Sequence, residues 1–121
     1  RFSLVPRGFG RTAFHLMETL QMGLVPIYVY SDTPWLPYGN IIKDVVYASS
    51  IVNVTHFMRW IDAVDNATVD NLERKIVSMR HSHFEPTAVM RHIAQFMSGG
   101  THDLVCQALP ASVRDERFRI S

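Results

Sequence analysis

The first 30 residues switch between two periods of hydrophobic positions. A short apolar run over residues 2–5 and a longer, β-branched and aromatic run over residues 24–30 both predict strands, the second buried on both faces. Between them, residues 12–22 repeat apolar side chains about one helical turn apart, at Phe14, Met17 and Leu20 or Gln21, and Gly23 suits the end of a helix. The pattern predicts a β-α-β unit with a turn over residues 6–11.

The pattern becomes helical after about residue 54. Residues 31–40, with two prolines and a glycine, predict a loop, residues 41–47 fit a helix or a strand, and residues 51–54 predict a third strand. Three helices follow in the prediction: residues 56–64 capped by Thr55, residues 69–83 capped by Thr68, and a third from Pro86 to residue 97.

The apolar positions of the last two helices predict which faces are buried. These positions are Val69, Leu72, Ile76 and Met79 in one helix, and Ala88, Met90, Ile93 and Phe96 or Met97 in the other. Residues 103–108 predict a last helical turn or two. The element order predicts an α/β fold with a Rossmann-like layer and a helix-rich second half. A three-stranded sheet leaves an open edge and the chain opens directly on a strand, so we expect a piece of a longer protein.

Composition narrows the classes of function. A hydrophobic content of 47% with 19% charged residues is typical of a globular domain, and a net charge of +1 favours neither nucleic acid nor an anionic membrane. Cys106 is the single cysteine, expected on a late buried helix, and His81-Ser82-His83 lacks a second ligand pair, so no metal site is predicted. We expect one domain over residues 1–110 and a charged tail over residues 111–121.

The turn between the first strand and the helix predicts a phosphate-binding site. Gly8 and Gly10 allow a tight turn, and the helix that follows offers unpaired N–H groups and the positive end of its dipole. Thr12 lies at the start of that helix. Arg7 and Arg11 can add bidentate contacts to a diphosphate, although a structural turn with solvated arginines fits the same residues.

The same residues fit a second function. Gly8, Gly10 and Ala13 match the dinucleotide-binding pattern G-x-G-x-x-A, and Asp32 follows the second strand where a ribose-binding acid is expected. A Rossmann oxidoreductase that uses NAD(P) is therefore an alternative. Arg7 before the first glycine and Glu18 beside the apolar face of the helix count against it, since a lone carboxylate there is costly without a partner. A ribose hydroxyl can be that partner, although Glu18 also fits a surface position on the helix flank.

The N-terminal third resembles the exostosin-like glycosyltransferases. The resemblance rests on Phe2, separated by three residues from Pro6-Arg7-Gly8, as in the family's aromatic-x-x-x-Pro-Arg-Gly. It also rests on residues 13–27, where Glu18-Thr19-Leu20-Gln21-Met22-Gly23 matches the family's Glu-Ala-Leu-Gln-x-Gly. Leu36-Pro37-Tyr38 is similar to its Leu-Pro-Phe, and residues 100–109 match its closing segment loosely. Ala13 and His15 stand where the family has Ser and Arg.

The resemblance implies the C-terminal, donor-binding domain of a two-domain, GT-B type enzyme. That enzyme would transfer a sugar with inversion from a nucleoside diphosphate sugar, often a UDP-sugar, to a glycan acceptor, with no cofactor. It would be a Golgi enzyme, anchored through a segment outside this chain, whose N-terminal domain is also outside it. Glu18 matches the family's ribose-binding acid, and Arg7 and Gly8 match its turn by the phosphates.

Three further expectations concern residues outside this turn. Asp32, Trp35 and Tyr38 are candidate donor or acceptor contacts, although an aromatic loop anchor packed on the core fits Trp35 and Tyr38 as well. No residue of the chain is assigned as the catalytic base. Because Ala13 and His15 weaken the expected phosphate contacts, a non-catalytic interaction module with the same fold is a third alternative.

Overall fold

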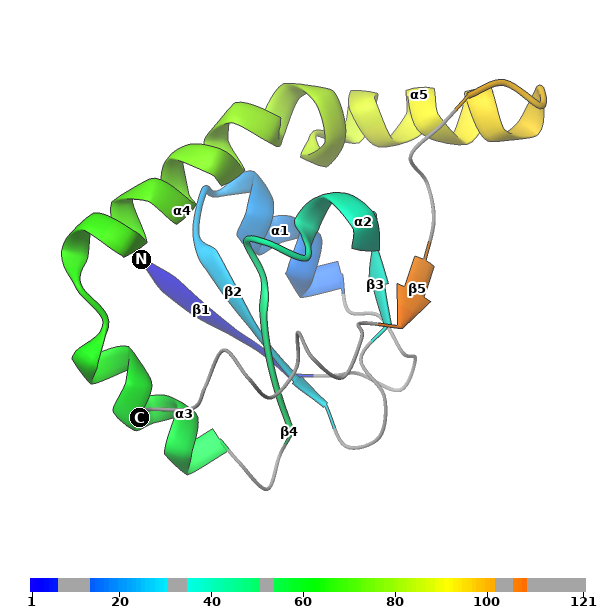
Figure 1. The fold of residues 1–121 in the computed structure, drawn as a ribbon. Helices are drawn as coiled ribbons and strands as arrows, with labels where there is room; N and C mark the ends of the chain where they lie inside the picture. The colour runs from blue at the N-terminus through cyan, green and yellow to red at the C-terminus, as the bar shows by residue number, and fades with distance from the viewer. Residues whose placement is uncertain (7–13, 31–34, 51–53, 102–105, 109–121) are drawn as a thin grey trace.

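The chain folds around a small parallel sheet with helices on both of its faces. The computed structural model describes residues 1–6, 14–30, 35–50, 54–101 and 106–108 (Figure 1). In chain order the elements are β1 (Phe2–Pro6), α1 (Phe14–Gln21), β2 (Val25–Tyr30), β3 (Trp35–Pro37), α2 (Gly39–Ile42), β4 (Tyr47–Ser50), α3 (Val54–Ala63), α4 (Asn66–Met79), the π-helical turn η1 (Arg80–Phe84), α5 (Pro86–Met97) and β5 (Cys106–Ala108).

The parallel sheet has the strand order β1-β2-β4, with β2 in the centre. Leu4 pairs with Ile27, and Ile27 pairs in turn with Tyr47. Five of the six residues of β2 are buried, as its continuous apolar run predicts. The predicted β-α-β unit and the mixed α/β class are therefore confirmed. A second, antiparallel pair of short strands joins β3 to β5.

Successive side chains along each strand point to opposite faces of the sheet, and the two faces pack against different helices. Phe2 and Tyr47 lie on the face covered by α3, where the ring of Trp60 is centred 6.2 Å from Phe2 and 4.5 Å from Tyr47. On the opposite face the Oγ of Ser3 contacts Thr19 of α1, and Val5 and Tyr28 are fully buried. Helices α1 and α3 thus enclose the sheet between them.

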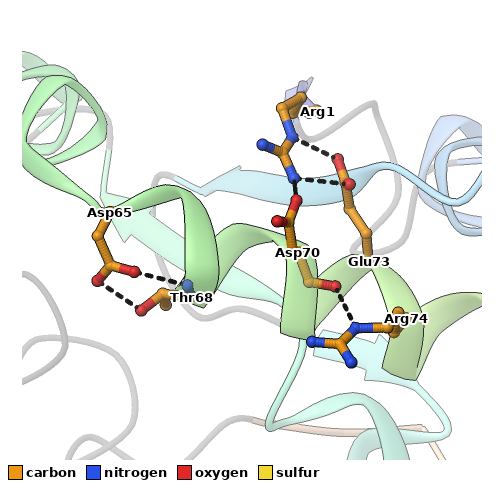
Figure 2. A network of polar contacts seen from close by, with 6 residues as sticks. All are labelled: Arg1, Asp65, Thr68, Asp70, Glu73 and Arg74. Carbon is orange, nitrogen blue, oxygen red and sulfur yellow. Dashed lines mark hydrogen bonds and ion pairs between the residues drawn. The ribbon is translucent and has the colours of Figure 1, made fainter.

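Helix α4 lies across the amino end of the sheet. At the start of β1, the Arg1 guanidinium donates to the carboxylates of Asp70 and Glu73 (Figure 2). This pairing raises the pKa of Arg1 and lowers that of Glu73. Before β2, a Cβ placed on Gly23 would lie 3.1 Å from Val77. These contacts leave the carboxyl end of the sheet on the side away from α4.

The cap of α4 differs from the prediction. Asp65 is the N-cap: its Oδ1 accepts from the Thr68 backbone N–H at 2.7 Å, and its Oδ2 accepts from the Thr68 hydroxyl at 2.7 Å (Figure 2). The prediction of Thr68 as the cap is therefore wrong, because the carboxylate three residues earlier provides a stronger acceptor. These bonds lower the pKa of Asp65. Helix α3 likewise begins one residue before the predicted cap Thr55.

The long helix predicted to residue 83 is interrupted by η1. The Glu85 N–H donates to the Arg80 carbonyl at 3.0 Å, a bond five residues back that widens the turn. Pro86 favours an extended residue before it, and Glu85 has φ −68° and ψ 148°. Helix α5 then restarts at Pro86 as predicted.

Several other local predictions are wrong. The third strand is residues 47–50 rather than 51–54, and Val54 already belongs to α3. Residues 35–37 of the predicted loop form β3, and residues 106–108 form β5 rather than a helical turn, so Cys106 lies on a strand. Residues 41–47, left open between helix and strand, contain the end of α2, a turn and the first residue of β4. The tail 111–121 lies outside the described residues.

Two predicted apolar faces are only partly buried. In α1 Leu20 is buried as predicted and Met17 is partly buried, together with the buried Leu16 and Thr19, whereas the side chain of Phe14 is 94% exposed. In α5 the buried residues are Ala88 and His92, and the apolar side chains at Met90, Ile93, Phe96 and Met97 are exposed. The α4 prediction is confirmed, since Val69, Leu72 and Ile76 are buried and Met79 is partly buried.

Candidate functional site

The three parallel strands end together at the edge of the sheet away from α4. Pro6 pairs with Val29, and Tyr30 pairs with Ser50, so the last residues of β1, β2 and β4 are neighbours. Segments 7–13, 31–34 and 51–53 continue the chain from these three residues. The carboxyl edge of a parallel sheet is where ligands bind in α/β folds.

Most of the predicted donor-binding residues belong to those segments. Arg7, Gly8, Gly10, Arg11 and Thr12 follow β1, and Asp32 follows β2; all six lie outside the described residues. Their attachment is nevertheless defined, because segment 7–13 joins Pro6 at the end of β1 to Phe14 at the start of α1. This is the strand-to-helix connection that the phosphate-site prediction requires.

Glu18 is on the described part of α1 and its carboxylate reaches solvent. Its side chain is 66% exposed, as the flank position predicts, and its Oε2 lies 3.4 Å from His15 Nδ1. Since Glu18 is not buried, the cost of a buried carboxylate that the sequence suggested does not arise. The opposite ring nitrogen of His15, Nε2, lies 3.3 Å from Ser3 Oγ.

Ser3, His15, Glu18 and Thr19 therefore form one polar cluster on β1 and α1. The Thr19 hydroxyl donates to Ser3 Oγ at 3.3 Å, and Thr19 itself is buried. The sequence pattern does not mark Ser3 as a site residue. Its contact with His15 depends on which residues of α1 face the sheet, and the apolar spacing favours Phe14 there instead.

Tyr38 and Trp35 lie at the second, smaller pair of strands. The ring of Tyr38 is buried, with edge contacts to His83 and His92 at centroid distances of 5.5 Å each. A buried ring favours the role of a core anchor over that of a sugar platform. Trp35 is the first residue of β3 and pairs with Ala108.

A stacked histidine pair lies beneath Tyr38. The rings of His83 and His92 are centred 5.1 Å apart, and His92 is buried, with its Nε2 2.9 Å from the Ser82 carbonyl oxygen. His81 instead contacts Glu85 on the surface at 2.9 Å. Within the described ranges, no group of three or more His, Cys, Asp or Glu residues could hold a metal ion.

An apolar groove of about 350 Å³ separates α1 from α5. Its lining is almost entirely apolar and consists of Phe14, Met17, Gln21, Tyr38, Pro86, Val89 and Met90. Met90 of its lining is one of several exposed apolar side chains on α5, a helix that extends beyond the sheet in Figure 1. None of the helices within the described ranges is both long and apolar enough to cross a membrane.

Comparisons with known proteins identify no relative: no protein-family model, curated protein or solved structure matches this chain.

Proposed function

We propose that this chain is the donor-binding part of a glycosyltransferase that resembles the exostosin-like family and binds a nucleoside diphosphate sugar, with UDP as the nucleotide. The observation that carries the proposal is the β1-α1-β2 unit. Its two parallel strands end side by side, so that the arginine- and glycine-containing segment 7–13 and the segment with Asp32 leave the sheet from the same edge.

The chemistry of a sugar nucleotide accounts for the residues at this edge. The leaving diphosphate needs positive partners for its developing charge, which Arg7, Arg11 and the N–H groups of the strand-to-helix connection can supply. The ribose needs an acceptor for its hydroxyl hydrogens. Glu18 offers an exposed carboxylate on α1, the helix that follows segment 7–13.

The wider context of the proposal comes from the resemblance. The chain would be the C-terminal, Rossmann-like domain of a two-domain enzyme, and its transfer would invert the anomeric carbon of the sugar. A glycan would be the acceptor, and the enzyme would lie in the Golgi lumen, anchored through another part of the protein. The base that takes the acceptor's proton is assigned to no residue of this chain.

A titration with UDP tests the nucleotide site. A ligand that binds only the folded state raises the melting temperature, and a concentration of a hundred times the Kd stabilises the fold by about 2.7 kcal/mol. We expect a rise with millimolar UDP, measured by differential scanning fluorimetry. In Arg7→Ala and Glu18→Gln we expect the Kd to increase about tenfold, equivalent to about 1.4 kcal/mol for each lost charged contact.

Two control variants show whether a weaker affinity for UDP comes from a lost contact at the site or from the change in net charge. Arg91→Ala removes an exposed arginine from α5, and Asp62→Asn neutralises an exposed carboxylate on α3. Both should bind UDP like the unmodified chain. A folded sample whose melting temperature does not change with UDP contradicts the proposal. Binding of NADH without UDP binding would favour the oxidoreductase, and UDP binding without transfer in the longer protein would favour the non-catalytic module.

A further inference from the structure

The polar cluster on β1 and α1 has the composition and order of an acyl-transfer site. Ser3 Oγ lies 3.3 Å from His15 Nε2, and the other ring nitrogen, Nδ1, lies 3.4 Å from Glu18 Oε2. A hydroxyl, an imidazole and a carboxylate are thus connected in series through opposite nitrogens of one ring. This is the arrangement by which a base activates a nucleophile while a third group orients the base.

The neighbouring hydroxyl of Thr19 sets the direction of the protons. Thr19 donates its hydroxyl hydrogen to Ser3 Oγ, so Ser3 keeps its own hydrogen for another acceptor. The unprotonated Nε2 of a neutral His15 is that acceptor. The ring then carries its hydrogen on Nδ1, where it donates to the Glu18 carboxylate. Each contact of the cluster is satisfied by a single set of proton positions.

The strand geometry adds a backbone donor next to Ser3. The Val25 N–H donates to the Arg1 carbonyl at 2.8 Å, which turns the backbone groups of Arg1 toward β2. Because residues along a parallel strand alternate in this respect, Ser3 also bonds toward β2 and the Leu4 N–H points to the outer side of β1. Among the described strands, β1 has no partner on that side. The Leu4 N–H is therefore placed to stabilise an oxyanion formed at Ser3.

We propose that Ser3, His15 and Glu18 form a second site, which cleaves carboxylic esters through an acyl-enzyme. Ser3 Oγ attacks the carbonyl carbon while its proton passes to His15 Nε2. The ester C–O bond then breaks, and the proton on Nε2 passes to the leaving alkoxide to give an alcohol. In the second half, water gives a proton to Nε2 and its hydroxide attacks the acyl carbon. The Ser3 ester bond breaks, the proton returns to Ser3 Oγ, and the acyl group leaves as a carboxylic acid.

This site shares Glu18 with the nucleotide site and is compatible with it. Glu18 contacts His15 through Oε2, so that Oε1 can accept from a ribose hydroxyl. Ser3 has no part in the nucleotide proposal. The two proposals can therefore fail separately: loss of Ser3 should end acyl transfer without changing the Kd for UDP.

Labelling with a fluorophosphonate tests for an activated serine. We expect one equivalent of the probe to attach to Ser3, located by mass spectrometry of the digested chain, and p-nitrophenyl acetate to be hydrolysed. Ser3→Ala should remove both the label and the hydrolysis. His15→Gln should lower kcat/KM about 100-fold, the usual contribution of a general base. Circular dichroism and the UDP titration show whether each variant remains folded.

Two surface residues provide the matched controls. Ser78→Ala removes an exposed hydroxyl from α4, and His56→Gln removes an exposed imidazole from α3. Neither change should alter labelling or hydrolysis. Labelling of another serine, no labelling in a folded sample, or hydrolysis that persists in Ser3→Ala but disappears in His15→Gln would each overturn the proposal, the last because it identifies simple imidazole catalysis.

Discussion

Gly23 lies two residues after the end of α1, where the chain turns into the central strand. Its φ is +74°, a conformation that costs little only for glycine. The Leu24 N–H donates to the Thr19 carbonyl and the Gly23 N–H to the Leu20 carbonyl, both at 3.1 Å. These two bonds form a Schellman motif, which satisfies carbonyls at the end of the helix. Gly23 therefore stops the helix, as its position in the sequence predicts.

Replacing Gly23 with alanine should destabilise the fold by more than 1 kcal/mol. The positive φ is strained for alanine, and the new Cβ would lie 3.1 Å from Val77 Cγ2 and 3.2 Å from an Arg80 nitrogen. Urea unfolding monitored by tryptophan fluorescence measures the change. Gly99→Ala is the control, since that glycine has a similar φ of +73° but nothing within 4 Å of the added Cβ. Equal losses in the two variants would show that contact with α4 adds nothing.

Helix α4 shows what one element contributes to the arrangement of the others. Its N-terminus is capped by Asp65, its apolar stripe is buried, and its acidic side chains hold Arg1 at the start of β1 (Figure 2). Helix α4 therefore contains both the residue pair that caps its N-terminus and the carboxylates that bind the start of β1. Variants of Asp65 and of Glu73 test these two contributions separately.

Asp65→Ala should lower the melting temperature by several degrees, because the Thr68 N–H loses its acceptor. Asp65→Asn keeps a capping oxygen and should recover most of the loss. Circular dichroism melting curves of the two variants provide the comparison. If the asparagine variant melts like the alanine variant, the charge of Asp65 near the helix dipole is the stabilising factor rather than the cap geometry.

The contact between Arg1 and Glu73 should make stability depend on pH in the acid range. The hydrogen bonds from Arg1 lower the folded-state pKa of Glu73, so its contribution is complete above the unfolded pKa of about 4.3 and is lost as pH falls through the folded value. Glu73→Gln should therefore be less stable than the unmodified chain at pH 7, and the difference should disappear as pH falls through the lowered folded-state pKa of Glu73. Urea unfolding across this range measures it. A difference that stays constant with pH would exclude the ion pair as its source.

Elements defined by local patterns were predictable, and elements defined by distant partners were not. β1, β2 and α4 follow from apolar runs and helical spacing. β3 and β5 were missed because each depends on pairing between residues about 70 positions apart, such as Trp35 with Ala108. β4 was placed too late, since its buried Ala48 and Ser49 are less apolar than the residues that follow. The stripe on α5 predicted a helix but not whether a partner covers it.

The candidate sites also contain residues that a local pattern predicts and residues that only the fold brings together. The glycines and arginines of the strand-to-helix turn are recognisable from their order alone. The approach of His15 to Ser3 is not, because it depends on which residues of α1 face the sheet. The apolar spacing favours Phe14, Met17 and Leu20 or Gln21 as the inward residues, whereas Leu16, Thr19 and Leu20 are buried and Phe14 is exposed. That difference in rotation brings His15 beside the edge strand.

Over the whole molecule, burial decreases from the central strand toward α5. β2 lies between α1 and α3 and is buried along nearly its whole length. Helix α5 is anchored through Ala88 near its start and His92 at its middle, while Phe96 and Met97 at its end are exposed. Local opening costs least where few buried contacts are lost.

Hydrogen exchange monitored by mass spectrometry should reproduce this gradient. Amides of β2 should exchange slowest, with protection close to the global free energy of unfolding, and those of residues 94–97 should exchange fastest among the helical amides of α4 and α5. Ile76→Val, a core change expected to cost about 1 kcal/mol, should accelerate β2 and leave residues 94–97 unchanged. Uniform protection across α4 and α5 would mean that both helices open only with the whole fold.

The ion pairs of Arg1 also have a consequence for the order of events during synthesis. Glu73 follows Arg1 by 72 positions, so at roughly 5–20 residues per second the ribosome adds this partner several seconds after Arg1 is made. β1 and α1 are therefore translated well before the carboxylates of α4 that bind Arg1. During this interval β1, α1 and β2 lack the ion pairs that join Arg1 to α4 in the folded chain.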